Sequence, residues 1–170
     1  MSWCRRAQKS RFRRAAFLIT VFLAGCGFQP VLAPGGAAIS LNGNVDVTVV
    51  DGRENFEFRR RILDRLSDPV SSAAFRIDYD LRITESAVTV SSDSDIERFT
   101  LLGLVSFQMI ETATGDAVLT DRVRATTGYS ATTDTFPTQI AERDARIRLA
   151  TALADQLVQV LQLNADILTE

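Results

Sequence analysis

The residues that could do acid–base chemistry in this chain are carboxylates, because the sequence contains no histidine. Two groups stand out by their spacing: Asp78 with Asp80 in an alternating segment, and the polar cluster of Asp93, Asp95 and Glu97. Paired carboxylates could act as general acid and base. Alternating acids are, however, typical of a solvated strand face, and the cluster lacks the glycine and closing glutamate of a calcium loop. We therefore expect no catalytic site and no metal site, and interpret the protein as a non-enzyme.

A second reactive residue is Cys26, whose thiol follows the small-residue run Leu23-Ala24-Gly25. Bacterial lipoprotein maturation requires this arrangement: the thiol takes a diacylglyceryl group, and cleavage before the cysteine frees its amine for another acyl chain. The expected modification is this covalent lipid on Cys26, with no other cofactor. Cys4 precedes the cleavage site, so the mature chain keeps no disulfide and no thiolate metal site.

Residues 1–25 have the parts of a cleavable lipoprotein signal peptide. Six basic residues come first and the ten apolar residues 15–24 follow. Ten residues are too few to span a bilayer, which takes about 20 in a helix. Position 27 is glycine and not aspartate, which favours transfer of the exported lipoprotein to the outer membrane. Two or more acyl chains would hold the protein there as an anchored and not a spanning protein.

The mature chain is acidic and has the size of one domain. The signal peptide removes six basic residues and no acids, which leaves 13 basic against 21 acidic residues and a formal charge of −8. Such a chain lacks the basic footprint of a nucleic-acid-binding protein. Residues 26–43, rich in glycine and proline, are predicted to form a lipidated flexible tether. Residues 44–170 are then a single domain, long enough for one core.

Hydrophobic periodicity in the domain predicts six elements in the order β-α-β-β-β-α. Alternating apolar residues predict strands over 45–50, 75–84, 98–112 and 117–129. Apolar residues at helical spacing predict helices over 54–66 and 137–163, and the apolar stripe of the longer helix, expected to face the core, begins at Ile140. Polar turns at 91–95 and 114–116 separate the last three strands. We therefore expect an α+β fold, a two-layer sandwich in which two helices cover one face of a four-stranded, mostly antiparallel sheet.

The other face of this sheet is expected to mix arginine with leucine. Alternation places five side chains there: Arg82, Leu102, Leu104, Arg122 and Arg124. Hairpins paired around their polar turns would set Arg82, Ser106 and Arg124 side by side, with Arg122 beside Gln108. Arginine forks suit phosphates, and exposed leucines near them suggest a binding surface. The alternative, in which the arginines pair with neighbouring acids as ordinary surface charges, stays open.

Several short motifs, in this order around the lipidation site, resemble the lipopolysaccharide-assembly lipoprotein family LptE. They are Cys26-Gly27-Phe28-Gln29-Pro30, Tyr129-Ser130, Ile140-Ala141-Glu142-Arg143-Asp144-Ala145 and Leu153-Ala154-Asp155-Gln156-Leu157. The resemblance spans the mature chain and includes the predicted element order. It departs at Val31-Leu32-Ala33-Pro34, where such proteins often carry Leu-Tyr-Gly.

The resemblance implies a subunit held inside the large outer-membrane β-barrel LptD, which helps that barrel to assemble and lipopolysaccharide to reach the outer leaflet. Arg82, Arg122 and Arg124 would then bind lipopolysaccharide, since the mature chain has no lysine for its phosphates. Leu102 and Leu104 would contact the barrel. The alternative is a periplasmic lipid-binding auxiliary lipoprotein of a lipid-transfer system, which would need an enclosed apolar pocket.

Overall fold

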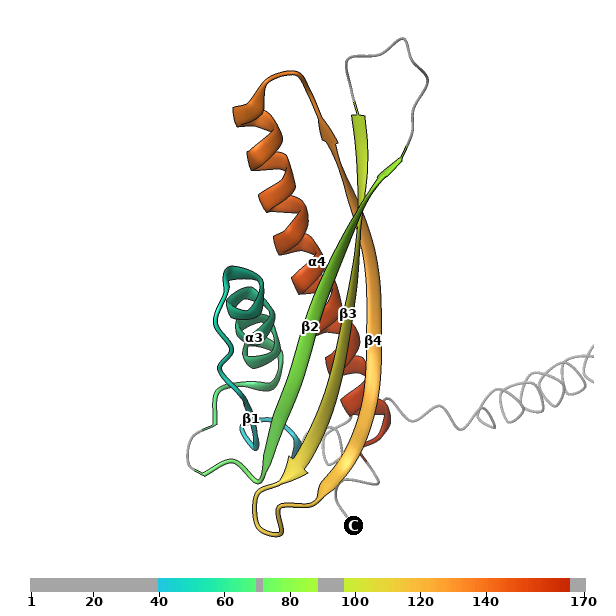
Figure 1. The fold of residues 1–170 in the computed structure, drawn as a ribbon. Helices are drawn as coiled ribbons and strands as arrows, with labels where there is room; N and C mark the ends of the chain where they lie inside the picture. The colour runs from blue at the N-terminus through green and yellow to red at the C-terminus, as the bar shows by residue number, and fades with distance from the viewer. Residues whose placement is uncertain (1–39, 70–71, 89–96, 166–170) are drawn as a thin grey trace, which may run out of the picture.

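The computed structural model describes residues 40–69, 72–88 and 97–165 (Figure 1). Its strands are β1 (Val45–Val47), β2 (Phe75–Val88), β3 (Glu97–Glu111) and β4 (Ala117–Ala131), and its helices are α3 (Arg53–Leu66) and α4 (Thr135–Leu163). The predicted order β-α-β-β-β-α and the α+β class are confirmed. Cys26, Asp93 and Asp95, together with the predicted signal peptide and most of the predicted tether, lie outside the described residues.

The four strands form one mixed sheet in the order β1-β2-β3-β4. The three long strands make an antiparallel meander, in which Phe75 pairs with Glu111 at one end of β2 and Val88 pairs with Arg98 at the other. β1 is short and runs parallel to β2, because the chain returns to the same end of the sheet through α3. It pairs only with residues 75–77 of β2.

Both helices lie on the same face of the sheet, as the sequence predicts (Figure 1). α4 packs on β3 and β4, while α3 packs beside α4 and over β1. α4 is about twice as long as α3 and extends above it along the sheet (Figure 1). The upper half of the sheet is therefore covered by α4 alone, and the thick core lies in the lower half.

The core is built from the apolar sides of all six elements. It includes the fully buried side chains of Phe58 and Ile62 from α3, Leu101 and Phe107 from β3, and Leu153 from α4. The ring of Phe58 also packs on Tyr79 of β2 at a centroid distance of 4.8 Å. β2, β3 and, from Leu119 onward, β4 alternate regularly. Their odd-numbered side chains therefore form the inner face of the sheet and their even-numbered side chains form the outer face.

α4 approaches β3 so closely at Gly103 that this strand position has little room for a side chain. A Cβ atom added at Gly103 would lie 2.6 Å from Cδ1 of Leu153 and 3.1 Å from Cγ of Leu149. Both leucines are fully buried. The absence of a side chain at Gly103 therefore sets the distance between the helix and the centre of the sheet.

The domain begins earlier than residue 44, where the sequence analysis placed its boundary. Leu41 is fully buried in the core. The next turn is fixed because the amide of Gly43 donates a hydrogen bond of 2.7 Å to the carbonyl of Leu66 at the end of α3. A single buried leucine in a segment rich in small residues carries no periodicity, which is why the pattern assigned it to the tether.

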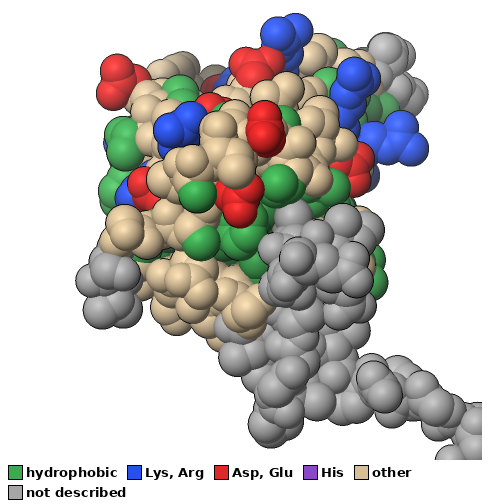
Figure 2. Space-filling model, turned by 90° about the horizontal axis from the view of Figure 1, so that it is seen from below, with side chains coloured by type: hydrophobic (Ala, Val, Ile, Leu, Met, Phe, Trp, Pro, Cys, Tyr) green, Lys and Arg blue, Asp and Glu red, His purple; other side chains and the backbone are tan. Residues whose placement is uncertain are grey.

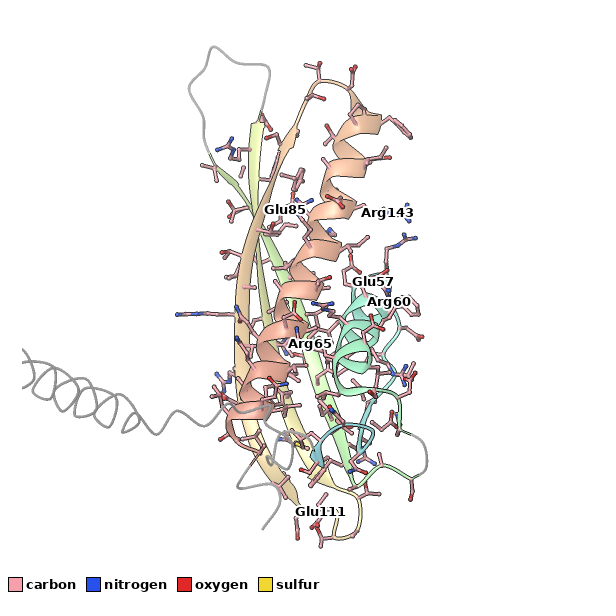
Figure 3. All side chains as sticks on the ribbon, turned by 180° about the vertical axis from the view of Figure 1, so that it is seen from behind. Glu57, Arg60, Arg65, Glu85, Glu111 and Arg143 are labelled. Atoms are coloured by element: carbon pink, nitrogen blue, oxygen red, sulfur yellow. The ribbon has the colours of Figure 1, made fainter. Side chains whose placement is uncertain are left out.

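The first turns of α4 differ from the predicted apolar stripe. Ile140 was expected to face the core but is 52% exposed, and Phe136 one turn earlier is also exposed. α3 does not reach this height, so no second helix covers these side chains (Figure 1). Lower down, Arg61 and Arg65 of α3 both bind Asp155 of α4, at 2.9 and 3.2 Å, and Figure 3 shows Arg65 between the two helices.

The lower end of the molecule shows hydrophobic side chains at the surface among charged ones (Figure 2). This is the end at which β1 begins and β3 turns into β4 (Figure 1). In the part of the chain that the structure describes, neither helix is both long and apolar enough to cross a membrane.

Candidate binding surface on the sheet

The outer sheet face, formed by the even-numbered side chains of β2, β3 and β4, carries all five residues that the sequence analysis placed there. Leu102 and Leu104 are 45% and 37% exposed, whereas Leu101 and Val105 on the inner face are fully buried. Arg82 and Arg124 are exposed as well. Alternation alone therefore assigned these side chains to the correct face.

The neighbours of these residues differ from those expected. Leu104, and not Ser106, lies between Arg82 and Arg124, because Arg82 pairs with Leu104 and Leu104 pairs with Arg124. Arg122 lies beside Ser106 and not beside Gln108. The result is a row in which a leucine separates two arginines.

The error is a shift of two residues in both strand pairs. Between β3 and β4 the register changes at Met109 and Ile110, where a bulge leads into the turn at Gly115. A shift of two keeps every side chain on its face, because the period of a strand is two residues. The hydrophobic pattern therefore could not reveal it.

The charges on this face divide into paired and unpaired groups. Arg82 donates to Asp80 at 2.7 Å, so for this arginine the alternative of an ordinary surface pair holds. Among the residues described in the structure, no carboxylate forms an ion pair with Arg122 or Arg124. These two guanidinium groups could therefore bind an anion without first giving up a carboxylate, and so could Arg98 near the start of β3, which is exposed and has no ion pair among the described residues either.

Asp78 is held by neighbours on two sides. The hydroxyl of Thr48 donates to one of its oxygens, and Arg76 donates to the same oxygen at 3.1 Å. The Thr48 hydrogen bond lowers the pKa of Asp78 below the ordinary carboxyl value of 3.8 against the opposing effect of burial, and the hydrogen bond and charge of Arg76 add to the lowering. A carboxylate that stays ionised in this way is a poor general acid.

A shallow hollow of about 700 Å³ lies on the same surface, next to the row of Arg82, Leu104 and Arg124. Its lining includes Asp78, Asp80, Ser106, Gln108, Asp121 and Arg122. Hydroxyl, amide, carboxylate and guanidinium groups are thus combined in one open depression. Such a surface can hydrogen-bond a polar or charged group, but it does not enclose an acyl chain.

The structure also shows a polar network on the inner face that sequence reasoning missed. Glu85 of β2 lies between the sheet and α4 (Figure 3). It accepts a hydrogen bond from the hydroxyl of Tyr129 at 2.8 Å and forms an ion pair with Arg146 at 3.2 Å. Arg146 also binds Glu142 at 2.8 Å. Burial, and then the Glu85 carboxylate, raise the pKa of Tyr129 to about 12, so its hydroxyl stays a donor.

This network replaces apolar packing where α3 no longer covers the sheet. A charge on the inner face costs free energy unless it is paired, and here each group has a partner. The signal in the sequence was Glu85 itself, which continues the inward positions of Tyr79, Leu81 and Ile83. Its partner Arg146 is 61 residues away, a distance that no local pattern covers.

In the described part of the chain, no cluster of three or more histidine, cysteine or acidic residues could hold a metal ion.

No family model matches the chain, and no curated protein matches it in sequence. Solved structures do share its fold. A candidate lipoprotein of Caulobacter crescentus CB15 aligns with a TM-score of 0.63 at 18% identity, over 75% of this chain and 94% of its own. Rare lipoprotein B of Shewanella oneidensis aligns with a TM-score of 0.56 at 11% identity, over 75% of this chain and 98% of its own. The TM-scores show that the chain shares its fold with these two lipoproteins.

Proposed function

We propose that this protein is an outer-membrane lipoprotein subunit of the lipopolysaccharide translocon, which supports assembly of an LptD-type β-barrel and insertion of lipopolysaccharide into the outer leaflet. Cys26 would carry the lipid. The domain would bind and hold its partners without breaking bonds. The observation that carries the proposal is the outer sheet face, where exposed Leu102 and Leu104 lie among Arg82, Arg122 and Arg124.

Three independent features support the proposal. The lipidation motif at Cys26 and the motifs that resemble the LptE family occur in one chain. The fold is shared with two proteins whose names place them among lipoproteins. The carboxylates best placed for acid–base chemistry, Asp78 and Asp80, are each engaged by an arginine.

The arginines and leucines suit the two chemical parts of such a partnership. Lipopolysaccharide carries phosphates, and guanidinium groups bind phosphate through paired N–H donors. With a mature charge of −8, attraction must come from local groups and not from the field of the whole protein. Arg122 and Arg124 supply such groups. Exposed leucines on a strand face supply apolar area for a protein contact.

The alternative, a periplasmic lipid carrier, receives no support from this surface. A carrier must enclose acyl chains in an apolar cavity. The hollow on the outer sheet face is open and includes Asp78, Asp80 and Asp121 in its lining. Phospholipid retained in stoichiometric amount through purification would favour the carrier.

Affinity purification from native membranes tests the proposal. The lipidated wild-type protein should recover one large β-barrel protein, and its depletion should reduce lipopolysaccharide at the cell surface. A Cys26→Ala variant, which cannot be lipidated, separates the anchor from the binding surface, since it should lose its membrane location but keep the fold. Recovery of the wild type as a free monomer, with surface lipopolysaccharide intact after depletion, would refute the proposal.

A further inference from the structure

The edge of the sheet at β2 is only partly used by β1. β1 pairs with residues 75–77 of β2, and its last bond runs from the amide of Thr48 to the carbonyl of Ile77. Beyond Ile77, among the residues that the structure describes, no backbone–backbone hydrogen bond reaches this edge of β2. The strand continues for eleven more residues to Val88.

The direction of the backbone groups on this edge follows from the bonds that β1 makes. Phe75 donates to β1 through its amide, and Ile77 accepts from β1 through its carbonyl. Backbone groups alternate in direction along a strand. The amides and carbonyls of Tyr79, Leu81, Ile83, Glu85 and Ala87 therefore point to the free edge. Those of the even-numbered residues point to β3.

The free edge, defined here as residues 79–87 of β2, is most accessible in its upper part. All five residues from Thr84 to Val88 are exposed, although their partners on β3 include the fully buried Leu101. Figure 1 shows why: α3 ends below this height, and the chain after β1 turns away from β2. The free edge spans about 27 Å at the usual rise of a strand.

The side chains along this edge favour the addition of a strand. Tyr79, Leu81 and Ile83 are half-buried on the inner face, and they are apolar residues or residues that favour strands. The segment contains no proline, glycine or lysine and no bulge in its pairing with β3. Proteins usually block an exposed edge with such features. The one charged residue whose backbone points to the free edge, Glu85, is paired with Arg146. An added strand would cover these side chains further and satisfy the unpaired backbone groups.

The opposite edge of the sheet is different. The residues of β4 whose backbone groups point outward include Arg122 and Arg124, which place two like charges along that edge. The outward carbonyl of Gly128 already accepts a hydrogen bond of 3.3 Å from Arg148 of α4. The pairing of β4 also contains the irregularity at Met109 and Ile110. β4 is therefore the better protected edge.

We propose that the free edge of β2 binds an extended segment of a partner polypeptide, which adds to the sheet as a fifth strand in line with β1. The complementary chemistry is a peptide backbone, because only an extended chain presents alternating amides and carbonyls at the spacing of this edge. The identity of the partner rests on the proposed function, under which the segment belongs to the β-barrel protein. The site itself rests on the unpaired backbone alone.

Hydrogen exchange at single-residue resolution tests the site in the full lipidated protein. In the isolated protein, the amides of Leu81 and Ile83 should exchange at least about tenfold faster than those of Arg82 and Thr84, which are bonded to β3. In the assembly purified from membranes, this alternation should disappear. Alternation that persists in the assembly overturns the proposal.

A pair of proline variants provides the matched control. Ala87→Pro removes an amide that points to the free edge, and Ser130→Pro removes one that points to the free edge of β4. Both side chains are exposed, and neither substitution removes a bond to β3, so both should fold. Ala87→Pro should lower recovery of the barrel protein about tenfold, equivalent to about 1.4 kcal/mol. Ser130→Pro should leave recovery unchanged. Equal recovery with both variants overturns the proposal.

The outcomes separate this proposal from the proposed function. If the barrel protein is recovered with wild-type yield while the amides of the odd-numbered residues of β2 still exchange rapidly, the strand site is overturned but the proposed function stands. Slow exchange in the membrane assembly without any barrel supports the strand site and refutes the function. Slow exchange of these amides in the isolated protein also overturns the proposal. If the exchange rate depends on protein concentration, the edge pairs with a second copy of the protein; if it does not, the edge pairs with the protein's own chain.

Discussion

Gly103→Ala should destabilise the domain, although it adds only one methyl group. The new Cβ would lie 2.6 Å from Cδ1 of Leu153 and 3.1 Å from Cγ of Leu149, whereas carbon atoms in contact normally stand about 3.5–4.0 Å apart. One methyl group must therefore move by about 1 Å in a region where both leucines are fully buried. Overpacking of this kind costs about 2 kcal/mol, which corresponds to a fall of about 6 °C in Tm for a domain of this size.

Thermal unfolding followed by circular dichroism measures the effect, and a second substitution tests its cause. Leu153→Ala alone should cost about 3 kcal/mol because it opens a cavity. Combined with Gly103→Ala, it leaves room for the new methyl group. The double variant should therefore be more stable than the sum of the single effects predicts, by about 1 kcal/mol or more. A neutral Gly103→Ala, or strict additivity, would falsify the claim that α4 and β3 meet through this glycine.

Three further predictions concern the outer sheet face. Arg122→Ala combined with Arg124→Ala should weaken binding of labelled lipopolysaccharide by about tenfold, the effect of one or two charge-assisted bonds, with Tm unchanged; unaltered binding would make these arginines ordinary surface charges. Leu102→Asp should reduce recovery of the barrel protein from membranes while the circular dichroism spectrum stays the same, and a variant that recovers the barrel fully would exclude this contact. Asp78→Asn should lower the urea midpoint at pH 7, because the folded-state pKa of Asp78 lies below 3.8 and its stabilising effect is present above that value. The difference from the wild type should shrink as the pH falls through the lower folded pKa, and Thr48→Val should show the same trend.

The elements of this fold are visible in the sequence because each one is amphipathic. The alternation from Phe75 to Ile83 and the helical spacing of Phe58 and Ile62 match the structure closely. The face of each strand residue follows from the same alternation. The outer position of Leu104 could thus be predicted, since the opposite assignment would expose the core.

The neighbours of each residue could not be predicted in the same way. A shift of two residues between strands preserves both faces, so the hydrophobic pattern is equally satisfied before and after it. The position of Leu104 beside Arg124 depends on the register between β3 and β4, which changes at a bulge at Met109 and Ile110, and its position beside Arg82 depends on the separate register between β2 and β3. The energy of such a bulge is a property of the local backbone, which the amino-acid composition does not reveal.

Long-range pairing is a second limit on prediction from the sequence. The pairing of Glu85 with Arg146, and of Arg61 with Asp155, joins elements that are distant in sequence. Periodicity shows that such charges occur but not which ones meet. For the same reason the exposure of Ile140 was missed, because it depends on where α3 begins and not on any property of α4.

The outer sheet face and the free edge of β2 meet at Asp80 and Arg82, and this proximity makes the two proposals interdependent. A strand added beside β2 would lie directly next to this ion pair, which is now largely exposed to solvent. Removing water from one side would strengthen the attraction between the two side chains. Arg82 would then be committed more firmly to Asp80, and Arg122 and Arg124, two strands away, would remain as the anion-binding groups. Strand addition would therefore concentrate the binding of phosphates on the β4 side of the sheet, so that protein and lipopolysaccharide would occupy opposite margins of the same surface.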